Sequence, residues 1–150
     1  MSTDETAAPR LVPLTELNQI IRENRVDDYK SPALALGMRP LEFGQGSSSW
    51  SWPEQPPTVL NPFGTLHGGF IAVFVDELFS TAIGSVLEAD EWAVTAEVKV
   101  SHLRPLRPGP ISGAARVLRR GRGVAFLEAE ISSADGAPAA RASSTWSISR

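Results

Sequence analysis

The stretch that decides the fold is Asn61-Pro62-Phe63-Gly64-Thr65-Leu66-His67-Gly68-Gly69, followed after six more residues by Asp76-Glu77. Residues 68–87 are apolar on nearly every face of a helix, which predicts a helix surrounded by protein. An ionised carboxylate inside such a helix is unfavourable unless something pairs with it. Because carboxylates kept in such places are concentrated at functional sites, we predict a chemical role for Asp76.

The start of this predicted helix has the features of an anion site. Gly68 and Gly69 lie where free backbone N–H groups point outward and where the helix dipole is positive. Such a site is suited to bind a developing oxyanion, because each preorganised donor aimed at new negative charge contributes about 2.7–4 kcal/mol to catalysis. The segment is therefore predicted to hold both an oxyanion hole and a base.

These two parts cannot serve one substrate from a single copy of the helix. Asp76 lies nine positions after His67, which at about 1.5 Å per residue separates them by roughly 13 Å along the axis. A reacting carbonyl group must lie about 3 Å from both the donor and the base. The spacing therefore predicts a two-fold dimer with antiparallel helices, in which Gly68 of one subunit faces Asp76 of the other.

The pattern Asn-x-x-Gly-x-x-His-Gly-Gly, with Asp76 seven residues further on in a long apolar helix, resembles the hot-dog-fold acyl-CoA thioesterases, specifically the phenylacetate-pathway-like group. The resemblance covers about residues 38–148. It implies an α+β fold in which an antiparallel sheet wraps around one long central helix. It also implies hydrolysis of acyl-CoA or aryl-CoA thioesters by a homodimer, and a dimer of dimers is common in the group.

The resemblance assigns roles to the motif residues. Asp76 is implied to be the general base or the nucleophile, and these two roles stay open. The Gly68 N–H with its neighbour Gly69 would form the oxyanion hole, and Asn61 would place water or the carboxylate. His67 would orient this loop. On the other hand, Asn61 can simply cap a turn and His67 can simply bond a carbonyl.

A hydroxyl group is also expected beside the carboxylate. The resemblance places it on the strand after the helix, where the chain has Thr95, and in a related branch one turn beyond the carboxylate, where it has Ser80. Thr95 has an equally plain structural interpretation, because β-branched residues fill strands. We interpret Glu77, about 100° around the helix from Asp76, as a dimer-surface or structural residue.

A basic segment follows the helix. Between residues 98 and 127 there are no acidic residues, and the segment suits the phosphates of coenzyme A. Solvated strands and turns explain it equally well, whereas the net charge of −3 and the lack of a recognisable binding module disfavour nucleic acid. The residues predicted to contact the phosphates are Arg104, Arg107, Arg119, Arg120 and Arg122.

Length and composition limit the remaining possibilities. A chain of 150 residues is expected to form one domain, here residues 31–150 after an N-terminal tail and helix in residues 1–30. The absence of cysteine excludes a thiol nucleophile. With only His67 and His102 we expect no metal and no cofactor. The polar, acidic N-terminus predicts a cytoplasmic protein, and the carboxylates in mid-helix argue against membrane insertion.

The pattern along the chain predicts the order of elements. A disordered tail at 1–12 precedes an amphipathic helix at 13–23 and a short helix at 31–36 capped by Ser31. One bent strand is expected at 39–52, and the long helix follows it. Four further strands are expected at 93–103, 111–118, 124–132 and 140–148, joined as an antiparallel meander.

Other functions leave weaker signatures. There is no Gly-x-Ser-x-Gly elbow, Walker loop or dinucleotide fingerprint. A hot-dog hydratase or dehydratase would use a different spacing, and a non-catalytic acyl-CoA-binding module would have no use for a buried carboxylate beside a thioester. Several aromatic residues could line an acyl or aryl pocket, but at these spacings aromatic residues more often belong to the core. These residues are Trp50, Trp52, Phe63, Phe70, Phe74 and Phe79.

Overall fold

The structure is a computed structural model that describes residues 16, 19, 23, 25 and 31–150. The predicted tail lies outside the described residues, as does the predicted helix at 13–23 apart from three isolated positions. No helix in the described ranges is long and apolar enough to cross a membrane. The elements are α2 (Pro32–Ala35), β1 (Arg39–Gly44), β2 (Ser47–Trp52), η2 (Pro57–Val59), α3 (Gly68–Gly84), β3 (Trp92–His102), β4 (Ile111–Arg120), β5 (Val124–Ser133) and β6 (Pro138–Ser149).

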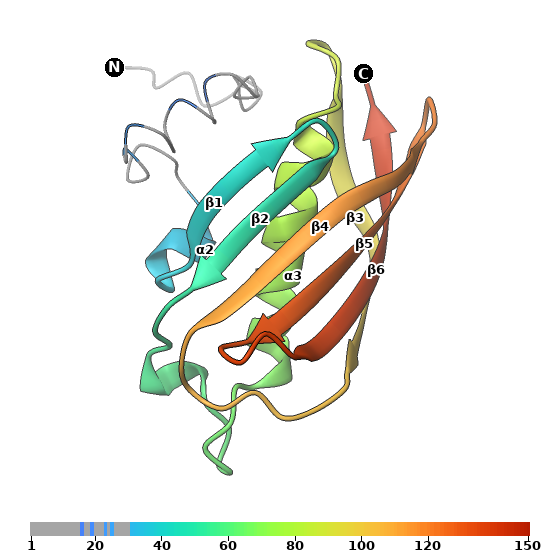
Figure 1. The fold of residues 1–150 in the computed structure, drawn as a ribbon. Coiled ribbons are helices and arrows are strands. Elements are labelled where there is room, and N and C mark those ends of the chain that lie inside the picture. The colour runs from blue at the N-terminus through green and yellow to red at the C-terminus, as the bar shows by residue number, and fades with distance from the viewer. Residues whose placement is uncertain (1–15, 17–18, 20–22, 24, 26–30) are drawn as a thin grey trace, which may run out of the picture.

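The strands form one six-stranded antiparallel sheet in the order β1-β2-β4-β5-β6-β3, and α3 lies in its hollow (Figure 1). The predicted α+β architecture is confirmed. The predicted four-stranded meander is wrong in one respect, because β3 pairs with β6 at the far edge and not with β4. The loop 103–110 carries three prolines, which lack the N–H of a tight hairpin, and it is held by buried Leu106 instead.

The segment 39–52 is a hairpin of two strands and not one bent strand. Arg39 pairs with Ser51 at its open end and Gly44 pairs with Ser47 beside the turn. Gly46 has φ of 74°, a left-handed conformation that glycine adopts without strain. The chain therefore reverses at the glycines, where the sequence pattern predicted only a bend.

Helix α3 begins and ends at polar contacts. His67 caps its start, and Ser31 caps α2 as predicted. The helix ends at Gly84, three residues before the predicted end. The Ser85 hydroxyl donates to the Ala82 carbonyl over 2.7 Å and accepts from the Gly46 N–H over 2.7 Å, so the last turn is fixed to the β1–β2 turn instead of being extended.

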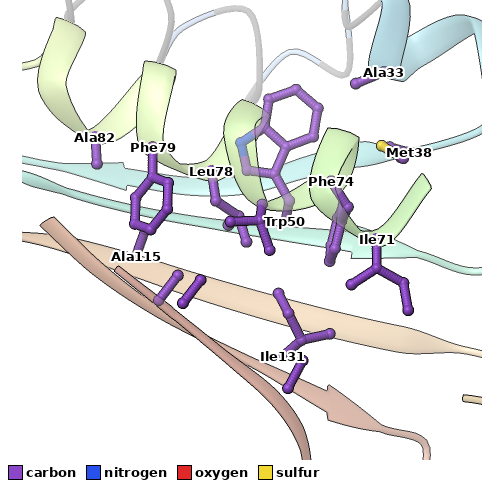
Figure 2. Packing of buried hydrophobic residues seen from close by; sticks show 14 of the residues in the cluster. Ala33, Met38, Trp50, Ile71, Phe74, Leu78, Phe79, Ala82, Ala115 and Ile131 are labelled. Carbon is purple, nitrogen blue, oxygen red and sulfur yellow. The ribbon is translucent and has the colours of Figure 1, made fainter. Parts of the chain in front are cut away.

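The core lies between α3 and the sheet (Figure 2). Phe74 and Leu78 of the helix point toward β4 and β5, where Gly113 allows their close approach. A Cβ on Gly113 would lie 2.6 Å from Leu78 Cδ1 and 2.8 Å from Ile131 Cδ1, so any larger residue would push the helix off the sheet. Trp50, fully buried, donates from Nε1 to Thr81 Oγ1 over 3.1 Å. The tryptophans of β2 are therefore core residues.

Candidate active site

One stripe of α3 is not covered by the protomer. Residues Phe70, Asp76 and Ser80 are half-buried along this stripe, and the Val73 side chain is 37% exposed. The prediction of a helix enclosed on every side is therefore wrong for the single chain, and Asp76 is only partly buried. The sheet wraps the opposite faces of the helix and ends at β3, which leaves this stripe uncovered within the single chain.

Asp76 is held by the strand beside it. The Thr95 hydroxyl donates to Asp76 Oδ1 over 2.8 Å, so the residue predicted to approach the carboxylate does so. A register irregularity between Thr95 and Glu97 marks a β-bulge, and bulges commonly re-aim a side chain near active sites. Thr95 is also the cross-strand partner of buried Trp146. Asp76 Oδ2 has no hydrogen-bond partner within the described residues.

The neighbouring polar residues of α3 have other partners. Ser80 donates from its hydroxyl to the Glu77 carbonyl over 3.0 Å, a bond within the helix. Glu77 accepts a 2.7 Å hydrogen bond from the Ser31 hydroxyl, which ties the start of α2 to α3. Glu77 is thus a structural residue in this chain, and Thr95, rather than Ser80, provides the hydroxyl beside Asp76.

The start of α3 offers one free backbone donor. The Gly69 N–H donates to His67 Nδ1 over 3.0 Å, so Nδ1 is the unprotonated ring nitrogen and the neutral ring carries its proton on Nε2. The Gly68 N–H has no acceptor among the residues that the structure describes. Of the two donors predicted for the oxyanion hole, Gly68 is therefore free and Gly69 is already used.

Asn61 organises the loop before the helix. Its Nδ2 donates to Thr65 Oγ1 over 2.7 Å, and its Oδ1 accepts from the N–H groups of Phe63 and Thr65 over 3.0 and 3.2 Å. The loop tip carries Phe63, whose exposure is 87%. In this chain Asn61 thus has the turn-capping contacts that sequence reasoning gave as an alternative to a role in placing water.

His102 lies beside the start of α3, a position that sequence reasoning missed. It is the last residue of β3, and its ring lies against the start of α3, with Nε2 3.2 Å from where a Cβ of Gly68 would stand. Its side chain is exposed, and it makes no hydrogen bond or ion pair inside the described ranges. A signal existed in the sequence: Val98, Val100 and His102 alternate with polar residues and so share one face of the strand.

Two of the five predicted phosphate-binding arginines are bonded within the protomer. Arg104 contacts Ser133, Asp135 and the Ala137 carbonyl in the β5–β6 turn. The Ser133 hydroxyl and the Ala137 N–H, aided by Arg104, hold the pKa of the Asp135 carboxyl well below its ordinary value. Arg104 therefore fixes a turn in this chain.

Arg120 pairs with Glu91, which is only 3% exposed. The hydrogen bond from Arg120, followed by the one from the Glu88 N–H, lowers the pKa of the Glu91 carboxyl. Arg150 approaches the other oxygen of Glu91 at 3.4 Å. This cluster anchors the loop between α3 and β3 to the end of β4, and Arg120 is a structural residue in it.

The other three arginines are accessible. Arg107, Arg119 and Arg122 are exposed and have no ion-pair partner in the part of the chain that the structure describes. Arg107 follows Leu106, whose carbonyl accepts from the Leu66 N–H over 2.8 Å, so Arg107 lies at the Gly68 end of α3. Arg119 and Arg122 lie at the other end, beside the Glu91 cluster.

The site is split along the helix. Gly68 and Asp76 belong to one continuous helix, and eight residues at about 1.5 Å each separate them by roughly 12 Å. One protomer thus presents a free N–H donor with His102 at one place and a carboxylate with Thr95 at another. A single carbonyl group cannot contact both within one chain.

A family model of the thioesterase superfamily matches residues 63–140, just over half of the chain. The matched segment runs from the loop before α3 into β6 and so contains both halves of the site except Asn61. The chain belongs to the thioesterase superfamily, and the predicted enzyme class, a thioester hydrolase, is confirmed.

Individual relatives agree with this membership. The Pseudomonas aeruginosa protein PA1618 is 33% identical over 114 residues, which are 75% of this chain and 78% of that protein. A solved variant of it, described as a thioesterase, superposes with a TM-score of 0.75 at 29% identity, covering 85% of this chain and 92% of that one. A phenylacetic acid degradation-related protein from Ralstonia eutropha gives 0.72 at 28% identity, with 83% and 97% covered. The predicted resemblance to the phenylacetate-pathway-like group is confirmed.

Proposed function

We propose that the chain hydrolyses acyl-CoA or aryl-CoA thioesters to the free acid and coenzyme A, in a site shared by two subunits. The observation that carries this proposal is the hydrogen bond from Thr95 to Asp76. It orients a carboxylate on the uncovered stripe of a thioesterase-superfamily helix and leaves Oδ2 available. A carboxylate placed in this way is suited to act as a general base.

The reaction proceeds through a tetrahedral intermediate. Asp76 Oδ2 removes a proton from water as the water oxygen bonds to the thioester carbon, and the carbonyl electrons move onto oxygen. The Gly68 N–H of the other subunit stabilises this oxyanion. Collapse re-forms the carbonyl group and breaks the C–S bond. The departing thiolate takes the proton from Asp76, which regenerates the carboxylate.

Direct attack by Oδ2 on the thioester carbon is the second route. It would form an acyl-aspartyl anhydride and release the thiolate before water enters. A single-turnover reaction quenched with hydroxylamine and followed by mass spectrometry of the protein distinguishes the routes, because hydroxylamine can open an anhydride at the aspartyl carbonyl and leave a hydroxamate on Asp76, which the thioester substrate alone cannot form. Absence of any trapped adduct supports the general-base route proposed here.

The exposed edge of the sheet supports the dimer. Strand β3 has 11 residues, lies at one end of the sheet, and exposes most of its side chains. Trp92 and Val94 on it are large exposed apolar residues. Long unprotected edges invite pairing with another chain. Pairing of β3 with its copy about a two-fold axis brings the uncovered stripes of two α3 helices together, antiparallel, so that Gly68 of each approaches Asp76 of the other.

The antiparallel arrangement also groups the free arginines. In antiparallel helices, the C-terminal end of one α3 lies beside the N-terminal end of the other. Each site takes Asp76 from one subunit and Gly68 from the other. Arg119 and Arg122 of the first subunit therefore lie on the same side of the dimer as Arg107 of the second. Guanidinium groups bind phosphate through paired hydrogen bonds. We assign the coenzyme A phosphates to this combined group.

The function is tested by mixing the protein with short, long and aromatic acyl-CoA thioesters and a thiol-reactive dye. The parent is expected to release free coenzyme A from at least one of them. Asp76→Asn is expected to lower kcat by at least about 10²-fold, as loss of a general base does. Glu42→Gln, at an exposed carboxylate on β1, is the matched control and should keep the parent rate. Binding without coenzyme A release by the parent would instead indicate a non-catalytic acyl-CoA-binding module.

A further inference from the structure

The oxyanion hole of the proposed thioesterase site needs a second donor. Pairs of donors are typical of such holes, and each contributes substantially to the rate. Gly69, the neighbour of Gly68, cannot serve in this chain, because its N–H already donates to His67 Nδ1 over 3.0 Å. Some other N–H or O–H group close to Gly68 must take this place.

We propose that His102 is this second donor, with its Nε2–H pointing at the thioester carbonyl oxygen beside the Gly68 N–H. This role rests on the proposed function. Among the ring atoms of His102, Nε2 lies nearest to the position that a Cβ of Gly68 would take, at 3.2 Å, while Cε1 is at 3.5 Å and Cδ2 at 4.0 Å. The ring therefore presents its nitrogen edge to the helix start. Either the Nε2–H tautomer or the imidazolium ion provides the donor.

The position of His102 follows from the bulge in β3. In a regular strand alternate residues share a face, so His102 would lie on the face opposite to Thr95. The irregularity between Thr95 and Glu97 shifts the alternation of side chains between the two faces of β3 by one residue. Val98 and Val100 consequently pack against the core, and His102 continues the same face to the start of α3. One bulge thus lets the strand present Thr95 to Asp76 and His102 to Gly68.

The environment of His102 fits a ligand contact better than a packing role. Its ring is exposed, and it makes no hydrogen bond or ion pair with any of the described residues. The close approach leaves little room beside Gly68, because a Cβ there would lie 3.2 Å from His102 Nε2. Gly68 and His102 come from the same subunit, so both donors face the carboxylate of the other subunit.

The test compares two variants of one residue. His102→Phe keeps a flat ring but removes the donor, and His102→Gln keeps a side-chain N–H. We expect His102→Phe to lower kcat by about 10²-fold with KM within about two-fold, since an oxyanion donor acts in the transition state. His102→Gln should recover a clear part of that loss. Ser101→Ala, at an exposed position on the opposite face of β3, is the control and should match the parent.

Thermal unfolding of all three variants shows whether each is folded. Because both substituted positions are exposed, the melting temperatures are expected to match that of the parent. Parent-like kcat in His102→Phe, equal losses in the Phe and Gln variants, or a loss confined to KM would overturn the donor role. These outcomes leave the proposed function standing, because the parent still releases coenzyme A in the same assay. A parent that releases none would overturn both.

Discussion

The Thr95 hydroxyl and the Asp76 carboxylate lie 2.8 Å apart across 19 residues of sequence, one on the edge strand of the sheet and the other on the uncovered stripe of the helix. Both belong to the same chain. The pair therefore forms a unit that each subunit can present to its neighbour.

Thr95→Val should lower kcat by about ten-fold with little change in KM, because a net hydrogen bond to a charged group contributes about 1.5–3 kcal/mol. Valine has nearly the same shape, so packing against β6 is kept. Thr95→Ser retains the hydroxyl and should keep most of the parent activity. Steady-state kinetics of the two variants measure the difference, and equal activity of both would show that the hydroxyl is not used.

Mixing two inactive variants should restore activity if the site is shared. A dimer of one Asp76→Asn subunit and one Gly68→Val subunit contains one site with both parent residues, so an equal mixture should regain about a quarter of the parent activity. Asp76→Asn mixed with Thr95→Val is the matched control. Because these residues act from the same subunit, that mixture has no fully intact site and should gain nothing. Proven subunit exchange without recovery in the first mixture would refute the shared site.

Alanine at Arg107, Arg119 or Arg122 should raise KM for acyl-CoA and flatten its dependence on salt, with kcat nearly unchanged, as expected for lost binding far from the reacting bond. Arg116→Ala removes the same charge, but Arg116 pairs with Glu128 over 2.6 Å on the outer side of the sheet. It should leave KM unchanged. If all three variants keep the parent KM, the phosphates bind elsewhere, and the basic segment is a solvated surface.

Glu91→Gln should change how stability depends on pH. The pKa of Glu91 is lower in the folded chain than its ordinary value of 4.5, so its contribution is complete above that value and is lost as pH falls through the folded-state pKa. Melting temperatures of the parent should therefore fall toward acid, and those of the variant should fall less. The variant should also melt lower at about pH 7, because it leaves the half-buried Arg120 without its carboxylate.

A second carboxylate variant serves as the control for Glu91→Gln. Glu54→Gln removes an exposed carboxylate that makes no ion pair within the described residues. Its melting curve should follow the parent at every pH. If Glu91→Gln also followed the parent at every pH, the Glu91–Arg120 pair would contribute no pH-dependent stability.

The sequence by itself determined the local structure and the identity of the motif. The apolar run after Gly68 predicted α3, the proline after Ser31 predicted α2, and turn residues marked the ends of most strands. These signals depend on neighbours within a few residues, so they can be read without the fold. The helical rise alone also showed that Gly68 and Asp76 are too far apart for one carbonyl group.

Only the tertiary structure decided what lies beside the motif. The bulge after Thr95 changes which residues of β3 face the helix, and regular alternation would place His102 on the wrong side. The edge position of β3 depends on pairing with β6, whose residues lie 38 to 57 positions away in sequence from their partners, and it leaves Asp76 partly exposed. Arg104 and Arg120 pair with carboxylates that are distant in sequence, Asp135 and Glu91, whereas Arg107 has no such partner among the described residues. Such contacts are set by long-range packing, which no local pattern of residues encodes.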